Sequence, residues 1–114
     1  MRNEKITLDI LLDKNNVCDT IQWEATQKPV EGAESAKAMS LALWDGWETG
    51  TVKIDLWTKD MEVHEMKRFC IEIINGLADT IRSATNDEVM AMDMENLCIK
   101  MEKRLKSEIG EKKS

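Results

Sequence analysis

Residues 51–69, TVKIDLWTKDMEVHEMKRF, change from the pattern of a strand to the pattern of a helix. Val52, Ile54 and Leu56 face one way, and the residues between and after them, Lys53, Asp55 and Trp57, face the other. This period of two is typical of a sheet with one buried face. Asp60 then stands where a helix would take its N-cap, and the apolar spacing becomes helical. The stretch therefore predicts a strand, a short acidic turn and the start of a helix.

Two further strands are predicted at the start of the chain, near residues 4–12 and 17–25. Apolar side chains alternate along both, and the turn residues 13–16, DKNN, stand between them. Asn tolerates the positive φ that tight turns need, so this segment predicts a β-hairpin. Cys18 falls on the face of its strand that points away from the apolar side chains.

A helix is predicted over residues 33–48, after a loop around Pro29. Apolar side chains recur there at helical spacing, and Thr49-Gly50 would end the helix. The side chains of this stripe are Ala36, Met39, Leu43 and Trp47, widened by Leu41, Ala42 and Trp44.

Two more helices follow, one over residues 61–83 and one that opens at residues 85–88, TNDE. The second opening fits the capping box T-x-x-E. Gly76 lies in the middle of the first of these helices, where it costs about 1 kcal/mol relative to Ala and would let another backbone approach closely.

The predicted order of elements is β-β-α-β-α-α, which indicates an α+β fold. About three strands would form a small antiparallel sheet with helices packed on it. The length of 114 residues suits one domain over residues 1–109, and the tail 110–114 is predicted to be disordered.

Charge is distributed unevenly along the chain, whose net charge is −6. Residues 1–99 carry 10 basic and 19 acidic side chains, whereas residues 100–114 carry 6 basic and 3 acidic ones. An acidic body argues against nonspecific binding to nucleic acid, which needs a basic surface. The basic end either touches an acidic partner or membrane surface, or simply suits the C-terminal end of a helix dipole.

The chain is expected to be cytoplasmic and not to span a membrane. Its apolar runs are too short for a membrane-spanning helix, and its N-terminus lacks the features of a signal peptide. Three cysteines at wide spacing make a poor disulfide framework. Cys70 and Cys98 fall on predicted apolar helix faces, where a thiol acts as a small hydrophobic group.

No catalytic, metal-binding or cofactor-binding constellation is apparent, so we expect a protein that is not an enzyme. His64 is the only histidine, and nothing in the sequence assembles a nucleophile or a ligand set around it. Nucleotide-binding glycine motifs and hydrolase motifs are also lacking. An exposed helical histidine is the simpler interpretation of His64.

Three side chains are candidates for contact with a protein partner: Trp57, Leu11 and Met92. Trp57 points to the strand face opposite Val52, where Leu11 would join it. This face is either open to water, which would make Trp57 an interface anchor, or covered by a helix, which would make it core. Met92 lies off the main stripe of a methionine-rich helix, and such surfaces bind partners adaptively.

The chain resembles the gliding-motility-associated GldC-type proteins of Bacteroidetes bacteria. The resemblance rests on the opening strand with its DKNN turn, on IQWEATQKPVEG, on AMSLALWDGW and above all on IDLWTKDMEVHEMKRF. The later NDEVMAMDMENLCIKMEKRLK is a looser match, and Cys70 stands where the family often has an aromatic residue. The resemblance implies an accessory protein without catalytic residues or a cofactor, associated with gliding motility.

Two functions follow as hypotheses. The first is an accessory protein that acts through protein–protein interaction, with gliding or secretion machinery as partner and with a homodimer as one form. The alternative is a small-molecule-binding or enzymatic α+β domain, for which a pocket beside His64 or Cys18 would be required.

Overall fold

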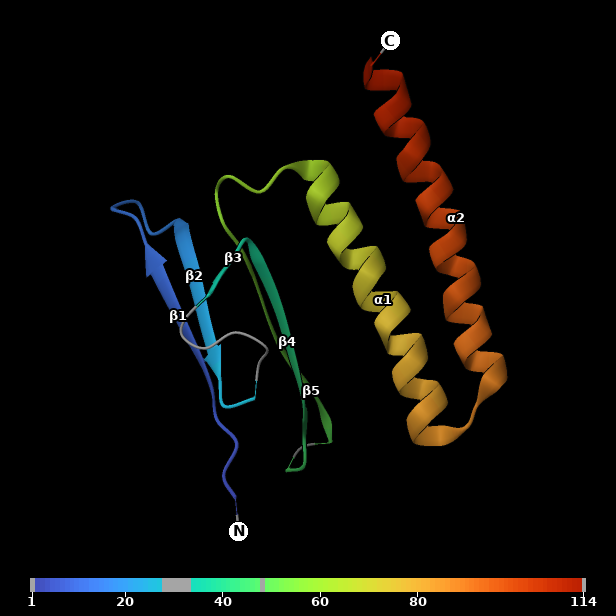
Figure 1. Ribbon diagram of the computed structural model, residues 1–114, viewed down its shortest axis with the longest axis horizontal. Coiled ribbons are helices and arrows are strands. Elements are labelled where there is room, and N and C mark those ends of the chain that lie inside the picture. The colour runs from blue at the N-terminus through green and yellow to red at the C-terminus, as the bar shows by residue number, and fades with distance from the viewer. Residues whose placement is uncertain (1, 28–33, 48, 114) are drawn as a thin grey trace. The chain divides into compact units, whose positions relative to one another are not determined.

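The computed structural model describes residues 2–27, 34–47 and 49–113, which fall into two compact units, residues 1–61 and 62–114 (Figure 1). The first unit consists of strands and the second of two helices. The predicted α+β class is confirmed. The order is β-β-β-β-β-α-α, however, so the predicted order β-β-α-β-α-α and the count of about three strands are wrong.

Five antiparallel strands form two small sheets in the first unit, which we call the sheet unit. One sheet has the order β1-β2-β3 and the other contains β4 and β5. The strands are β1 (Ile6–Leu12), β2 (Cys18–Ala25), β3 (Glu34–Ala36), β4 (Ala38–Asp45) and β5 (Gly50–Trp57). Most of the loop predicted around Pro29 lies outside the described residues.

The first two strands form the predicted hairpin, in which Ile10 pairs with Ile21. Asp13 closes its turn, because its carboxylate accepts hydrogen bonds from the N–H groups of Asn15 at 2.8 Å and Val17 at 3.0 Å. Asn16 adopts the positive φ, 62°, that the turn requires.

Residues 34–45 form strands and not the predicted helix. Their apolar side chains also alternate, and β5 supplies matching partners: Met39 pairs with Leu56, Leu41 with Ile54, and Leu43 with Val52. These cross-strand pairs place six apolar side chains on one face of the β4–β5 sheet. Pairing with a distant strand therefore overrides the helical preference of Ala, Leu and Met.

A β-bulge in β2 changes the face of the sheet to which the side chain of Cys18 points. Leu11 pairs with Thr20, but Leu12 pairs with Cys18, so Asp19 is the extra residue. Cys18 is consequently buried, contrary to the prediction that it points away from the core. The bulge also directs Asp19 toward Lys59, and the two side chains form an ion pair at 3.2 Å.

The two sheets are joined where the chain leaves β5, at a cluster of Cys18, Lys37, Thr58 and Lys59 that we call the corner. The N–H of Thr58 donates to the carbonyl of Lys37 at 2.7 Å, and that of Lys59 donates to the carbonyl of Cys18 at 3.1 Å. Lys59 also pairs with Asp13 at 3.3 Å. The segment after the third predicted strand is therefore a structural junction.

Two long helices, α1 (Val63–Thr85) and α2 (Glu88–Lys113), form the second unit, which we call the helical unit. Glu62 is the N-cap of α1, and Glu65 accepts a hydrogen bond from its N–H at 3.0 Å. The predicted cap, Asp60, instead accepts the hydroxyl hydrogen of Thr58. Helix α2 continues to Lys113, and the single domain over residues 1–109 stays a prediction.

The turn between the helices uses different residues from those of the predicted capping box. The carboxylate of Asp87 accepts the N–H of Met90 at 3.0 Å, so Asp87 takes the capping role predicted for Thr85. Glu88 instead binds Arg82 at 2.8 Å. Hydrogen bonds from Arg82 to Glu88 and Glu95 keep the pKa of Arg82 above its usual value.

The helices lie side by side (Figure 1) around a core of Ile71, Cys98 and Leu105. Ala78 and Ala91 have no exposed surface, so the smallest buried side chains lie near the turn. Gly76 does not serve the predicted close approach, because a Cβ at this position would meet nothing within 4 Å.

Candidate functional site

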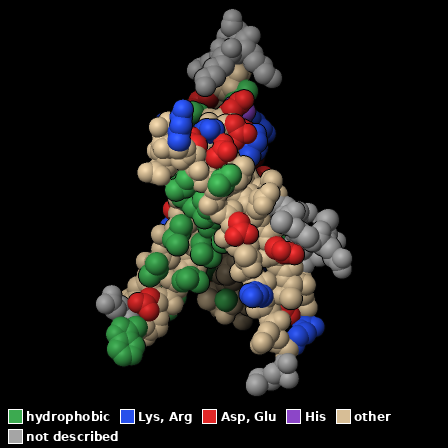
Figure 2. Space-filling view, turned by 90° about the vertical axis from the view of Figure 1, so that its left-hand side faces the viewer, with side chains coloured by type: hydrophobic (Ala, Val, Ile, Leu, Met, Phe, Trp, Pro, Cys, Tyr) green, Lys and Arg blue, Asp and Glu red, His purple; other side chains and the backbone are tan. Residues whose placement is uncertain are grey.

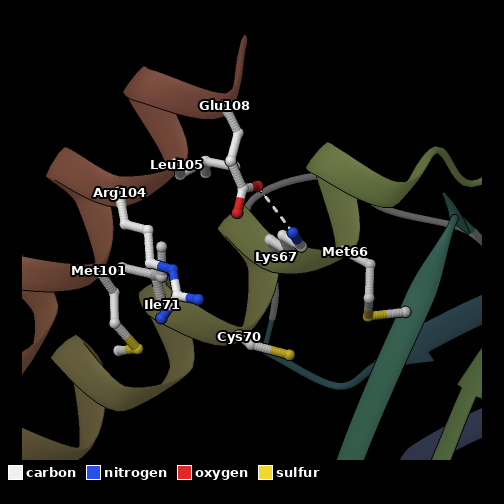
Figure 3. A pocket seen from close by; sticks show the side chains of 8 residues that line it. All are labelled: Met66, Lys67, Cys70, Ile71, Met101, Arg104, Leu105 and Glu108. Carbon is white, nitrogen blue, oxygen red and sulfur yellow. Dashed lines mark hydrogen bonds and ion pairs between the residues drawn. The ribbon is translucent and has the colours of Figure 1, made fainter. Parts of the chain in front are cut away.

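An apolar groove of about 400 Å³ runs between α1 and α2, near the start of α1 and the end of α2 (Figure 3). Both helices contribute to it through residues one turn apart, which lie on the same side of a helix. The groove is lined by Met66, Lys67, Cys70 and Ile71 of α1 and by Met101, Arg104, Leu105 and Glu108 of α2.

The floor of the groove is part of the helical core. Ile71 and Leu105 are buried, and Met101 packs against them. Because these side chains already pack on one another, they hold the groove in shape without a ligand. Methionine side chains at its walls can adjust to ligands of different shape.

Three charged side chains line the groove, and two of them pair with each other. Lys67 of α1 and Glu108 of α2 form an ion pair at 2.7 Å that connects the two helices. The guanidinium of Arg104 forms no ion pair or hydrogen bond with any residue in the described ranges. The groove therefore offers a cation with free donors beside an apolar surface, which favours a ligand that is apolar and carries one negative charge.

The two helical cysteines have different environments. Cys98 is buried, its thiol donates to the carbonyl of Ile71 at 3.5 Å, and burial raises its pKa. Cys70 is exposed, so the prediction that it packs as a core residue is wrong. Its position at the margin of the apolar stripe places it on the wall of the groove.

The side of the helical unit opposite to the groove carries acidic side chains. A hollow of about 280 Å³ there is lined in part by Glu72, Glu95 and Glu102. Glu95 pairs with Arg82 at 2.7 Å, and Glu102 pairs with Arg68 at 3.4 Å. Of these two hollows, both lined by described residues, the first combines a largely apolar lining with an arginine whose guanidinium is unpaired.

The groove contains no catalytic arrangement. His64 is exposed, pairs with Glu62 at 3.3 Å and is not among the residues that line the groove, and neither is Cys18. Within residues 2–27, 34–47 and 49–113, no group of three or more His, Cys, Asp or Glu side chains could hold a metal ion. The arrangement is suited to binding.

The three predicted contact residues lie on three different elements. Trp57 ends β5, and Leu11 lies on β1 in the other sheet, so no single sheet face carries both. Met92 lies on α2 in the helical unit. All three side chains are exposed, Trp57 to 56%, and their role as contacts stays a prediction.

Further apolar side chains are exposed on the β4–β5 sheet. Leu43, Val52 and Ile54 share the apolar face of that sheet, and each is about half exposed. Figure 2 shows hydrophobic side chains gathered on one face of the molecule.

A family model described as gliding motility-associated protein GldC-like matches residues 18–107. The chain belongs to the GldC-like family. This match confirms the resemblance found in the sequence and covers β2 to most of α2, including the corner and every lining residue of the groove except Glu108. Neither the curated proteins nor the solved structures contain a match to this GldC-like chain.

Sequence reasoning did not find the groove of this GldC-like protein. Met66, Met101 and Leu105 recur at helical spacing and were read as apolar helix-face side chains, whereas Ile71 lies off that spacing. The available signal was Arg104, a charged residue that directly precedes Leu105, and Leu105 belongs to the apolar stripe of its helix.

In the part of the chain that the structure describes, no helix is both long and apolar enough to cross a membrane.

Proposed function

We propose that this GldC-like chain is a non-enzymatic accessory protein of gliding motility that acts in the cytoplasm by binding a protein of the gliding or secretion machinery. Membership of the GldC-like family supports the association with motility. The groove on the helical unit supports binding, and the observation that carries the proposal is the unpaired Arg104 beside an apolar lining.

The chemistry of the groove favours an amphipathic helix as its occupant. Helices bind to grooves between other helices through apolar side chains that recur every three or four residues. An acidic residue of such a helix would pair with Arg104, while the Lys67–Glu108 pair would mark one end of the contact. The expected partner segment is therefore apolar on one face and carries an Asp or Glu on that face.

The exposed thiol of Cys70 provides a direct test. Cys18 and Cys98 are buried, so a thiol-reactive photo-crosslinker attached to the folded protein should label Cys70 selectively. Irradiation in native cell extract, followed by mass spectrometry, should recover an amphipathic segment of a gliding or secretion protein. Capture of a segment without helical apolar spacing would contradict the proposal.

Charge reversal at Arg104 tests the same groove. Arg104→Glu should lower the affinity for the captured segment by about tenfold or more, because an attraction becomes a repulsion. Lys103→Glu is the matched control, since Lys103 is exposed on the same helix and is not a lining residue. Replacing the acidic residue of the partner by Lys should restore binding to Arg104→Glu. Equal losses in both variants would show a nonspecific charge effect.

Trp57, Leu11 and Met92 remain proposed contacts, and Trp57→Glu tests the sheet unit separately. Because Trp57 is more than half exposed, the variant should fold, as circular dichroism can show. Loss of the partner in Trp57→Glu, together with unchanged binding in Arg104→Glu, would assign the contact to the sheet unit.

A further inference from the structure

Strand β1 is an unpaired edge of the three-stranded sheet. Its inner side pairs with β2, and no strand of the described residues pairs with its outer side. The other sheet also has an outer edge, along β5, but the N–H of Lys59 just beyond β5 bonds to Cys18 of β2. Strands β3 and β4 likewise have no second partner strand among the described residues, so β1 is one of several open edges, and open edges are templates for another strand.

The hydrogen-bond pattern fixes which residues of β1 point outward. The carbonyl of Lys5 accepts the N–H of Thr26 at 3.0 Å, so Lys5 points toward β2. In an antiparallel ladder this direction alternates, so Thr7 and Asp9 also bond inward. Ile6 and Leu8 direct their N–H and carbonyl groups to the open edge.

The charges along this edge are complementary to those of a second copy of β1 that runs antiparallel to the first. In a two-fold antiparallel arrangement centred on Thr7, Lys5 lies opposite Asp9 of the second copy, and Asp9 lies opposite Lys5 of the second copy. Ile6 and Leu8 then meet as an outward-bonding pair of apolar residues. An arrangement centred on Asp9 would instead place two carboxylates opposite each other.

We propose that β1 pairs with β1 of a second copy of this chain, in an antiparallel arrangement with its two-fold axis at Thr7. The pairing extends the three-stranded sheet into one of six strands and partly covers Ile6, which is 73% exposed. A hollow of about 310 Å³ beside Lys5, Thr7 and Glu24 leaves room for the Asp9 side chain of the second copy, which reaches Lys5. This surface is separate from the groove of the helical unit.

A charge swap tests the proposal. Analytical ultracentrifugation should show a dimer, and Asp9→Lys should raise its dissociation constant at least about tenfold, because both symmetric pairs become repulsive. Lys5→Asp should do the same, and the double variant Lys5→Asp, Asp9→Lys should restore the dimer. A monomeric wild type, or a double variant no better than either single variant, would overturn the proposal.

Disulfide trapping tests the register independently of charge. Thr7 would form a non-hydrogen-bonded pair with Thr7 of the second copy, with Cα atoms about 4.5 Å apart, a distance that a disulfide can span. In a Cys70→Ser background, Thr7→Cys should therefore form a covalent dimer on oxidation. Leu11→Cys is the matched control, because its two copies would lie about 27 Å apart. Cross-linking of Leu11→Cys but not Thr7→Cys would refute the register.

Discussion

The helical unit and the sheet unit differ in how they hold their structure. Helices α1 and α2 bury Ile71, Ala78, Ala91, Cys98 and Leu105 between them. In the described part of the sheet unit only Cys18, Ile21 and Thr58 are buried, while three of the six apolar side chains on the β4–β5 face are exposed. The sheet unit therefore depends more on its backbone ladders and on the polar corner than on a buried apolar core.

The largest effect is expected in the core of the helical unit. Leu105 is 3% exposed and packs with Ile71 and Cys98. Leu105→Ala should lower the free energy of unfolding by about 2–5 kcal/mol, because it removes buried methyl groups and leaves a cavity. Urea unfolding followed by circular dichroism measures this loss. Lys106→Ala, at the exposed neighbouring position, should change it little. A loss near zero for Leu105→Ala would remove the contrast between the units.

A smaller effect is expected at the corner of the sheet unit. Thr58→Val keeps the shape of the buried side chain but removes the hydroxyl that donates to Asp60. The free energy of unfolding should fall by about 1 kcal/mol, since the freed carboxylate can bind water. All four tryptophans, Trp23, Trp44, Trp47 and Trp57, lie in the sheet unit, so their fluorescence reports its unfolding. An unchanged midpoint would show that the corner contributes nothing beyond its backbone bonds.

The outer side of α1 offers a stabilising change. Gly76→Ala should raise the free energy of unfolding by about 0.5–1 kcal/mol, because Ala restricts the unfolded chain and its Cβ meets nothing within 4 Å. Circular dichroism during urea unfolding should show a higher midpoint. A lower midpoint would mean that Gly76 contacts another part of the molecule, as the sequence predicted.

The smallest effect is expected from the pH dependence of the turn at Asp13. Hydrogen bonds from the N–H groups of Val17 and Asn15 lower the pKa of this carboxylate below 3.8. The resulting stabilisation is fully present above the pKa of Asp13 in the unfolded chain, and it is lost as the pH falls through the lowered pKa of the folded protein. Asp13→Asn keeps an acceptor oxygen but does not titrate, so its tryptophan-detected stability should fall less between neutral pH and about pH 3. Identical pH profiles would show that Asp13 is not a source of acid sensitivity.

Local patterns were sufficient for several elements. The DKNN turn between alternating strands predicted the β1–β2 hairpin, because Asp and Asn favour turn conformations through their own side chains. The stripes of α1 and α2 predicted two long helices for the same kind of local reason. Residues 34–45 were misassigned because their composition favours a helix, whereas their strand structure depends on partners in β5.

The candidate site could be predicted only in part. The sequence left Trp57 open between an exposed contact and a core side chain; the structure has Trp57, Leu11 and Met92 exposed, and their role as contacts stays a prediction. The groove was missed because Met101 and Arg104 acquire a shared role only when α1 lies against α2. Cys18 was misplaced for a similar reason, since the bulge at Asp19 depends on the pairing of β1 with β2.

The sequence by itself determined the α+β class, the first hairpin, the two long helices and the resemblance to GldC-type proteins, because these depend on short-range periodicity, turn residues and recognisable local stretches. Only the tertiary structure decided that residues 34–45 are strands, that Lys59 joins the two sheets, and that Arg104 stands unpaired beside an apolar groove. Each of these depends on contacts between residues far apart in the chain, and the free energy of such contacts is not encoded in any local pattern.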